Sequence, residues 1–207
     1  MFVDFHIHES TYSTDSKLTL KEIVEEARQI GLDGVCITDH DSMGLKEYAE
    51  AYSKEVDFPI FVGAEYYSRE GDILAFGIDR LPDEMRIPAQ DFIDYVNERG
   101  GVCIAAHPFR DNRRGLEENL KLVHGLAGIE VLNGNTSMED NRKALRYAQE
   151  LGLQCTGASD AHNVFALGRF ATWVPDDVRT LDDLVAAIKA QLCKPAILNG
   201  FKVSETF

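Results

Sequence analysis

The 207-residue sequence lacks the motifs of several common protein classes. Neither G-x-G-x-x-G nor G-x-x-x-x-G-K-[ST] occurs in it, which argues against a nucleotide-cofactor fold. No apolar run approaches the length of a membrane span, and the first residues lack the basic and then apolar pattern of a signal peptide. We therefore expect a protein with no membrane partner.

Cysteine is scarce and shows no pairing motif. The four cysteines are Cys36, Cys103, Cys155 and Cys193; none makes a C-x-x-C pair, and three lie in apolar, strand-like segments. This usage is typical of small buried side chains in a reducing compartment and not of disulfides or a thiolate metal site. A cytoplasmic location is therefore expected.

Basic side chains are outnumbered by acidic ones. The sequence has 21 Lys and Arg against 35 Asp and Glu, for a formal net charge of -14. A field of this sign repels long nucleic acids and anionic membranes, so we expect a small partner. A site for several divalent cations would use part of the acidic excess.

Short apolar strands alternate with amphipathic helices along the chain. Strands are predicted within 2–8, 34–40, 58–67, 71–79, 102–109, 128–134, 153–162, 170–175 and 195–200, and helices within 19–31, 44–55, 89–101, 115–127, 138–152 and 180–192. Glycines mark three helix ends, at Gly31, Gly100 and Gly152. The pattern predicts one domain over 1–207 with a mostly parallel sheet wrapped by helices, and six or seven strand–helix units favour a barrel over an open sheet.

Five of the six histidines lie near the ends of predicted strands, together with several carboxylates. Along the chain these residues are His6 and His8, then Asp39, His40 and Asp41, then Glu65 closing the third strand, then His107, and finally Asp160 with His162. Asp72 opens the fourth strand, and Glu130 lies in the sixth. Because strand ends of a parallel barrel meet at one mouth, we interpret the cluster as one shared site.

The donor types indicate the metals. Imidazole and carboxylate without thiolate suit Zn, Mn or Fe(II), and about eight or nine ligands are too many for one ion. Two or three divalent ions that share a bridging carboxylate would use them all. Glu65 is the candidate bridge, although on its own it would be interpreted as a solvated loop residue.

The motifs resemble those of a known family. Residues 4–41, DFHIHESTYSTDSKLTLKEIVEEARQIGLDGVCITDHD, are similar to the first two motifs of the PHP (polymerase and histidinol phosphatase) family, and GAE, AAHPFR and SDAH follow in the family's order. The resemblance spans essentially the whole chain and is strongest to small stand-alone bacterial phosphoesterases. It implies a distorted (β/α)7 barrel with a trinuclear metal site and, here, no inserted cap domain.

The resemblance also implies three ligand groups. These are His6, His8, Glu65 and Asp160 for the first ion, Glu65 and His107 for the second, and Asp15, His40 and His162 for the third. Only the family pattern points to Asp15, which otherwise reads as part of a turn and helix cap. Many relatives carry a histidine where this chain has Asp72, so Asp72 either ligates the second ion through oxygen or is a turn residue.

Several further residues are candidates for supporting roles. Arg110 either binds two phosphate oxygens or is a surface arginine, and Arg169 is a weaker candidate. Ligand orientation is expected from Asp39 and Asp41. Hydrogen bonds to ligands or substrate are expected from Glu130 and Asn133, and a structural or orienting role from Asp4. His124 is expected to end a helix and to have no catalytic role.

The expected function is hydrolysis of a small phosphate ester or a nucleotide by a metal-bound hydroxide. Arg110 would hold phosphoryl oxygens, and Asp160, His162 or water would protonate the leaving group. Two alternatives stay open. One is an amidohydrolase acting on a C–N bond, disfavoured because no strand-end lysine is available as a carbamylated bridge; the other is a non-catalytic metal-binding accessory domain. The oligomeric state and the substrate leave no signal in the sequence.

Overall fold

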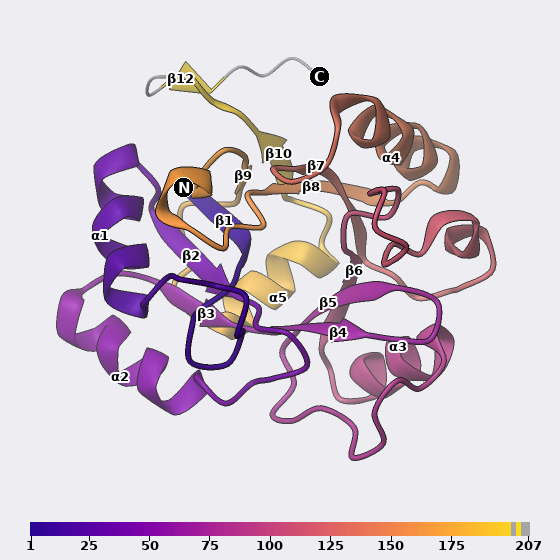
Figure 1. The fold of residues 1–207 in the computed structure, drawn as a ribbon, viewed down its shortest axis with the longest axis horizontal. Coiled ribbons are helices and arrows are strands. Elements are labelled where there is room, and N and C mark those ends of the chain that lie inside the picture. Colours follow the sequence, from indigo (N-terminus) through magenta and orange to yellow (C-terminus); the bar gives the residue numbers. More distant parts are fainter. Residues whose placement is uncertain (200–201, 204–207) are drawn as a thin grey trace.

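Two five-stranded sheets lie at the centre of the molecule, with helices packed around them (Figure 1). A computed structural model describes residues 1–199 and 202–203. The strands are β1 (Phe2–Ile7), β2 (Gly34–Ile37), β3 (Ile60–Val62), β4 (Ala64–Tyr67), β5 (Asp72–Phe76), β6 (Val102–Ala105), β7 (Gly128–Asn133), β8 (Gln154–Ala158), β9 (Ala171–Trp173), β10 (Lys194–Ala196), β11 (Leu198–Asn199) and β12 (Lys202–Val203). The helices are α1 (Leu20–Ile30), α2 (Lys46–Val56), α3 (Ala89–Glu98), α4 (Met138–Leu151) and α5 (Leu181–Lys189), with 3-10 turns η1 (Glu117–Lys121) and η2 (Val164–Ala166).

Local sequence signals set the helix limits. The Thr19 hydroxyl accepts a hydrogen bond from the Glu22 N–H at the start of α1, and the Glu22 carboxylate accepts one from the Thr19 N–H. Gly31 and Gly152 adopt left-handed conformations at the ends of α1 and α4, with φ of 86° and 65°. Gly100, with φ of 83°, lies two residues beyond the end of α3. The predicted glycine stops are thus present.

The two sheets mix parallel and antiparallel pairs. The first has the order β10-β9-β1-β2-β3, parallel from β1 to β3 and antiparallel where β9 pairs with β1 and β10. The second has the order β4-β5-β6-β7-β8, antiparallel from β4 to β6 and parallel from β6 to β8. The α/β class is confirmed, while the antiparallel pairs make the sheets less uniformly parallel than predicted.

The sheets meet along two seams. At one seam β3 runs into β4 through Gly63, where a Cβ atom would lie 2.5 Å from the Ala75 carbonyl oxygen, so only glycine fits. At the other seam the His8 N–H donates to the Ala161 carbonyl at 3.1 Å. Isolated bridges also join Ile7 to Ala161 and His40 to Glu65. The strands therefore form a ring of two sheets, and ladder hydrogen bonding between described strands is interrupted at both seams.

Two local predictions are wrong. Glu65 does not close the third strand, because β3 ends at Val62 and Glu65 lies within β4. The segment 115–127 forms no α-helix and contains only η1, because Glu117 and Gly125 both have positive φ, which interrupts helical hydrogen bonding. His124 therefore follows a 3-10 turn and does not end a helix.

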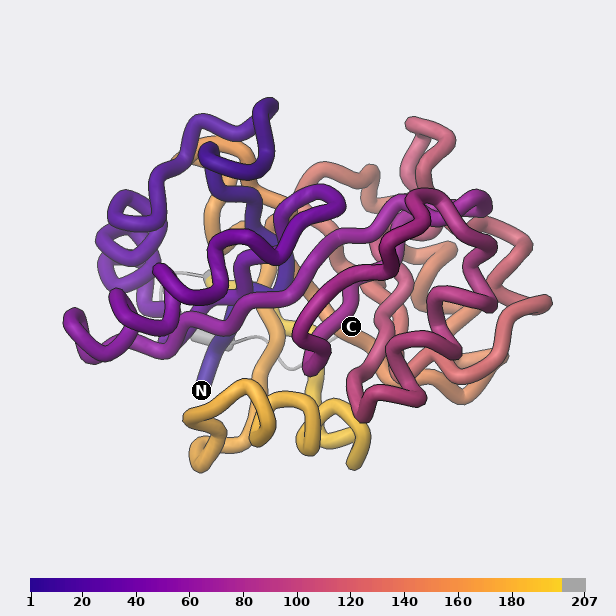
Figure 2. Tube along the Cα trace, turned by 90° about the horizontal axis from the view of Figure 1, so that it is seen from below, coloured from indigo at the N-terminus to yellow at the C-terminus, as the bar shows by residue number. Residues whose placement is uncertain are grey.

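Three hydrophobic clusters hold these layers together. One lies between β1–β3 and helices α1 and α2, and another lies between the second sheet and helices α3 and α4. The third fills the space between the sheets, where Leu184, Val185 and Ile188 of α5 pack with Val3 and Val102. Burial of each such side chain away from water contributes roughly 1.5–3 kcal/mol to the stability of the fold. Helix α5 thus closes one end of the ring, opposite the loop that follows β1 (Figure 2).

Among the described residues, no helix combines the length and apolar character needed to cross a bilayer.

Asp4 ties the second seam together from inside. Its buried carboxylate accepts hydrogen bonds from the Ser159 N–H at 2.9 Å and the Gly168 N–H at 3.1 Å, and burial raises its pKa to about 6.

We predict that Asp4→Ala lowers the free energy of unfolding by about 2–4 kcal/mol, because buried donors lose their acceptor. Asp33→Ala is the matched control, since Asp33 is exposed and accepts a hydrogen bond from the Phe2 N–H. In urea unfolding, this variant should lose less than about 1 kcal/mol of the free energy of unfolding. Equal losses would contradict the prediction.

Candidate metal centre

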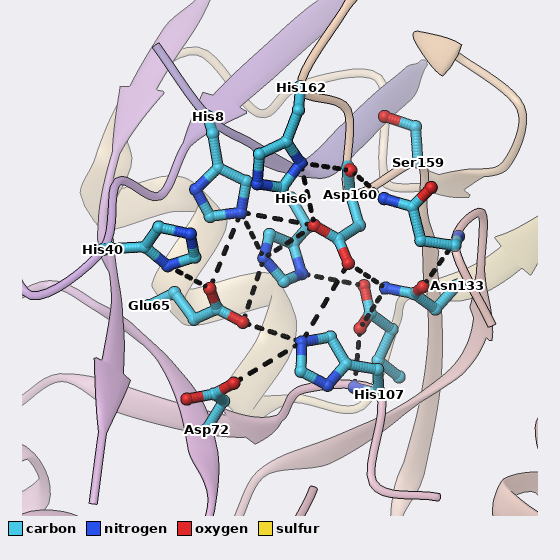
Figure 3. Close-up of polar contacts among 12 residues, drawn as sticks. His6, His8, His40, Glu65, Asp72, His107, Asn133, Ser159, Asp160 and His162 are labelled. Atoms are coloured by element: carbon cyan, nitrogen blue, oxygen red, sulfur yellow. Dashed lines mark hydrogen bonds and ion pairs between the residues drawn. The ribbon is translucent and has the colours of Figure 1, made fainter. Parts of the chain in front are cut away.

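Imidazole and carboxylate groups from several segments meet at the end of the ring that α5 leaves open (Figure 3). His6 lies in β1 and His8 just after it, while His40, His107, Asp160 and His162 follow β2, β6 and β8 within a few residues. Glu65 and Asp72 lie in the antiparallel strands β4 and β5. The structure therefore brings the predicted strand-end residues together; that they bind ions stays a prediction.

Glu65 lies at the centre of the cluster. Its Oε1 is 2.8 Å from His107 Nε2 and 3.4 Å from His6 Nε2. Its Oε2 is 2.7 Å from His40 Nδ1 and 3.6 Å from His8 Nε2. The side chain is only 1% exposed, so both carboxylate oxygens are used within the protein.

Asp160 completes the inner part of the cluster. Its Oδ1 lies 3.3 Å from His8 Nε2 and 3.7 Å from His6 Nε2, and its Oδ2 lies 4.0 Å from His107 Nε2. His6 and His8 also point their Nε2 atoms at each other across 3.0 Å, as the side-by-side placement on one strand predicts. All four side chains are buried.

An outer group lies between this inner part and solvent. Asp15 Oδ2 is 3.2 Å from His40 Nε2 and 3.4 Å from His162 Nε2. The side chains of His40 and His162 are 23% and 22% exposed, and that of Asp15 is 57% exposed. The residue that only the family pattern indicated therefore joins two of the histidines at the entrance.

Glu130 and Asn133, both on β7, support the inner part. Glu130 Oε1 lies 3.2 Å from His6 Nδ1, and its Oε2 accepts from the His107 N–H at 2.8 Å. The Asn133 amide donates to Glu130 Oε2 at 3.0 Å and to Asp160 Oδ2 at 3.2 Å. The predicted hydrogen bonds to ligand candidates are thus present.

A second support chain runs through Ser13, which sequence reasoning missed. The Ser13 hydroxyl donates to Asp39 Oδ1 at 2.8 Å and lies 3.3 Å from His8 Nδ1. Asp39 therefore acts on His8 through Ser13. Asp41 instead accepts from the Tyr67 N–H at 2.9 Å and holds β4 in place. A serine in a loop has no sequence signal that marks such a contact.

Two arginines enter the site. Arg110 Nη1 donates to Asp160 Oδ2 at 2.8 Å, which places the predicted candidate against the cluster. Arg114 binds Asp72 with both Nε and Nη2, and it was missed because it stands in an arginine-rich loop that reads as surface. Arg169 points elsewhere, donating to the Gly134 carbonyl at 2.9 Å.

The backbone is strained at two of the cluster's residues. His107 has φ of 27° and Asp160 has φ of 54°, a region that non-glycine residues rarely occupy. Such conformations persist where the surrounding structure enforces them, and they are common at functional sites.

The close packing of charges shifts the pKa values strongly. Burial alone would lower the pKa of His6, but the charges of Asp160, Glu65 and Glu130 raise it well above the ordinary value. Burial lowers the pKa of His8 to about 4. Despite their burial, Glu65 and Asp160 have pKa values held well below the ordinary range by the adjacent histidines. The inner carboxylates therefore stay ionised near neutral pH.

The donor set fits divalent ions. Ligand atoms 2.0–2.2 Å from an ion would be roughly 3–3.5 Å apart, and the inner nitrogen–oxygen distances of 3.3–3.7 Å lie close to that range. Buried His40 Nδ1 and His107 Nδ1 have no hydrogen-bond partner in the described part of the chain, although His40 Nδ1 is close to Glu65 without the geometry of a hydrogen bond. Four groups of three donors are compact enough for an ion, and each includes at least one histidine.

The fold is of the α/β class, and the site has the donor composition of a metal centre. The family model for the PHP domain matches residues 4–162, and a PHP-associated model matches residues 138–193. This chain therefore belongs to the PHP family.

Among the relatives, a probable histidinol-phosphatase of Thermotoga maritima is 26% identical over 207 residues, covering 81% of this chain and 87% of that protein. A 3',5'-nucleoside bisphosphate phosphatase of Chromobacterium violaceum is 31% identical over 111 residues, covering 52% of this chain and 39% of that protein. An uncharacterized protein of Methanocaldococcus jannaschii is 29% identical and covers 64% of this chain and 82% of its own length.

Solved structures share the fold. PsfC from Pseudomonas syringae superposes with a TM-score of 0.69 at 20% identity, covering 95% of this chain and 91% of that one. A two-domain protein from Bacteroides vulgatus, described as containing a predicted PHP-like metal-dependent phosphoesterase, superposes with a TM-score of 0.74 at 20% identity; the match covers 95% of this chain and 64% of that one.

The raised histidine pKa values predict a pH dependence of the ion-free protein. Because His6, His40 and His107 have raised pKa values, the folded state binds protons more strongly than the unfolded state. Their contribution to stability is complete below about pH 6.5 and is lost as the pH rises through the folded-state values. Urea unfolding with a chelator present, to keep the protein free of ions, should therefore give a smaller free energy of unfolding at about pH 8.5 than at about pH 6.5.

His8 acts in the opposite direction, but only between its folded pKa of about 4 and the unfolded value near 6.5, below the window tested. Saturating Mn²⁺ or Zn²⁺ should reverse the trend, because ions replace the protons. Stability of the ion-free protein that rises with pH across this window would refute the prediction.

Proposed function

We propose that this chain is a metal-dependent phosphoesterase that hydrolyses a small phosphorylated substrate. The observation that carries the proposal is the convergence of five histidines on the buried carboxylates of Glu65 and Asp160. Family membership supports it, as do relatives whose names describe phosphatases of histidinol phosphate and of nucleoside bisphosphates. The single-domain organisation over 1–207 remains part of this proposal.

The inner cluster would hold two divalent ions, either Mn, Zn or Fe. His6, His8, Glu65 and Asp160 would bind the first ion, and Glu65 and His107 the second, with Glu65 as the bridge. The outer group of Asp15, His40 and His162 would bind a third. When bound, such ions lower the pKa of water and neutralise charge on a phosphoryl group.

Arg110 would bind the phosphoryl oxygens at the mouth. Its guanidinium is anchored to Asp160 by one hydrogen bond and its side chain is 30% exposed, so further donors face outward. A fixed cation at this place would stabilise the negative charge that spreads over the oxygens in the transition state.

The leaving group needs a proton, and two side chains were expected to supply it. Asp160 is poorly suited because its lowered pKa keeps it ionised. His162 lies at the partly exposed rim and donates or accepts through two nitrogens. The number of bound ions decides its role, because His162 is free for proton transfer only where the outer group holds no ion.

The substrate would be small. Residues 77–88, between β5 and α3, form a short connection without an inserted domain. The net charge of -14 disfavours long polyanions. Amide hydrolysis is the less favoured alternative, since no lysine lies among the described residues that line the site.

Glu65→Gln tests the proposal without changing the size of the side chain. Losing the central negative charge should lower the number of bound ions and reduce phosphatase activity by at least about 10³-fold. The His6→Ala, His8→Ala double variant should behave in the same way. Ion content is measured by elemental analysis, and activity on histidinol phosphate, 3',5'-bisphosphorylated nucleotides, cyclic phosphates and an amide panel.

His124→Ala is the control, since His124 is exposed and lies outside the cluster; it should match the wild type in ion content and activity. Circular dichroism checks that each variant is folded. Full phosphatase activity in folded Glu65→Gln would contradict the proposed mechanism, and activity confined to the amide panel would favour the amidohydrolase alternative.

A further inference from the structure

Arg114 and Asp72 are joined by three hydrogen bonds at the edge of the cluster. The Asp72 N–H donates to the Arg114 carbonyl at 2.6 Å. In return, Arg114 Nε and Nη2 donate to the two Asp72 carboxylate oxygens at 2.7 Å and 2.9 Å. A two-pronged pair of this kind fixes the plane of the guanidinium as well as its position.

The backbone holds this pair in place. A Cβ atom on Gly71 would lie 2.5 Å from the carbonyl carbon of Gly115, and one on Gly115 would lie 2.2 Å from the Pro108 carbonyl oxygen. The Glu117 N–H also donates to the Pro108 carbonyl at 2.9 Å. The loop 108–116 is therefore folded tightly back on itself and pressed against the turn between β4 and β5.

Tyr67 further limits the movement of the guanidinium. Its ring centroid lies 4.6 Å from Arg114 Cζ and 3.9 Å from Arg86 Cζ, both within the range of a cation–π contact. Arg114 is thus held by a carboxylate and by an aromatic ring, while its side chain remains 32% exposed.

The exposed part of Arg114 faces the candidate metal centre. It lines a cavity of about 80 Å³ together with Arg110, His107 and Asp160. Its Nη1 makes no hydrogen bond to any residue in the part of the chain that the structure describes. A fixed donor that faces the cluster without a protein partner suits a phosphoryl oxygen.

Asp72 lies close enough to Glu65 and His107 to share an ion with them, with its Oδ2 3.8 Å from His107 Nε2. Its carboxylate is nevertheless already occupied by Arg114. Both Asp72 oxygens already accept from Arg114, and an ion on that carboxylate would bring a second positive charge close to the guanidinium.

We propose that Arg114 binds a phosphoryl oxygen of the substrate and that Asp72 is a positioning residue for Arg114, not a ligand of the second ion. The inference rests on the proposed function, because both concern the same site. On the β5 side of the site, the guanidinium of Arg114 would then take the place of a metal ligand. It would neutralise negative charge of the substrate there.

The test compares three variants: Asp72→Asn, Arg114→Gln and Arg113→Gln. Each protein is loaded with Mn²⁺, its ions are counted by elemental analysis, and inorganic phosphate binding is measured by calorimetry. All three variants should bind as many ions as the wild type. Asp72→Asn and Arg114→Gln should weaken phosphate binding about tenfold or more, because a charge-assisted hydrogen bond is lost or misaligned.

Arg113→Gln is the matched control, since it changes the charge equally at the adjacent, exposed residue and should leave phosphate binding unchanged. Arg114→Lys should restore part of the binding, because the charge returns without the two-pronged geometry. In turnover, Arg114→Gln should raise KM more than it lowers kcat.

Loss of one ion in Asp72→Asn would overturn the inference and make Asp72 a ligand, as would wild-type phosphate binding in Arg114→Gln. Ion uptake by the wild type is measured first. A wild type that takes up no ions contradicts the proposed function itself, whereas ion uptake with either of the two results above contradicts only the roles of Asp72 and Arg114.

Discussion

The burial of Glu65 is the constraint on which the site depends. A carboxylate that is 1% exposed must be neutralised by neighbouring positive charge, because an unpaired buried charge is very costly. Three histidines on three segments, His6, His40 and His107, provide that charge as protonated imidazoles, and the neighbouring carboxylates raise the pKa values of all three. Ions could take over the same task from the protons. The cluster is therefore built to hold positive charge in either form.

Fold geometry makes this arrangement possible. The loops that follow β1, β2, β6 and β8 open at one end of the ring, while α5 packs against the other end. The backbone at Gly63 packs closely against the Ala75 carbonyl, which lets β3 of the first sheet continue directly into β4 of the second. Glu65 lies in β4, just after this connection. Strain at His107 and Asp160 is held by the contacts of Glu130 and Asn133, so the support on β7 is part of the site's rigidity.

Local signals explain why much of this could be predicted from sequence. Capping residues and helix-end glycines act over a few residues, and strand-end histidines need only a parallel arrangement to converge. Three features depended on contacts between distant segments. The strand break before Glu65 follows from packing against Ala75 and Phe76, the failed helix over 115–127 follows from a loop folded back on Pro108, and Arg114 matters only because it meets Asp72. The only local signals among them are the glycines at Gly63 and Gly125.

The cluster contains residues from both sheets and therefore spans the seams between them. His8 and His40 belong to the first sheet's segments, and Glu65, His107 and Asp160 to the second sheet's. Backbone pairing across the seams consists of few bonds, so the side chains of the cluster add to the connection that the apolar residues between the sheets provide. Bound ions would act there as cross-links between the two sheets. Separation of the sheets and release of the ions would then occur together.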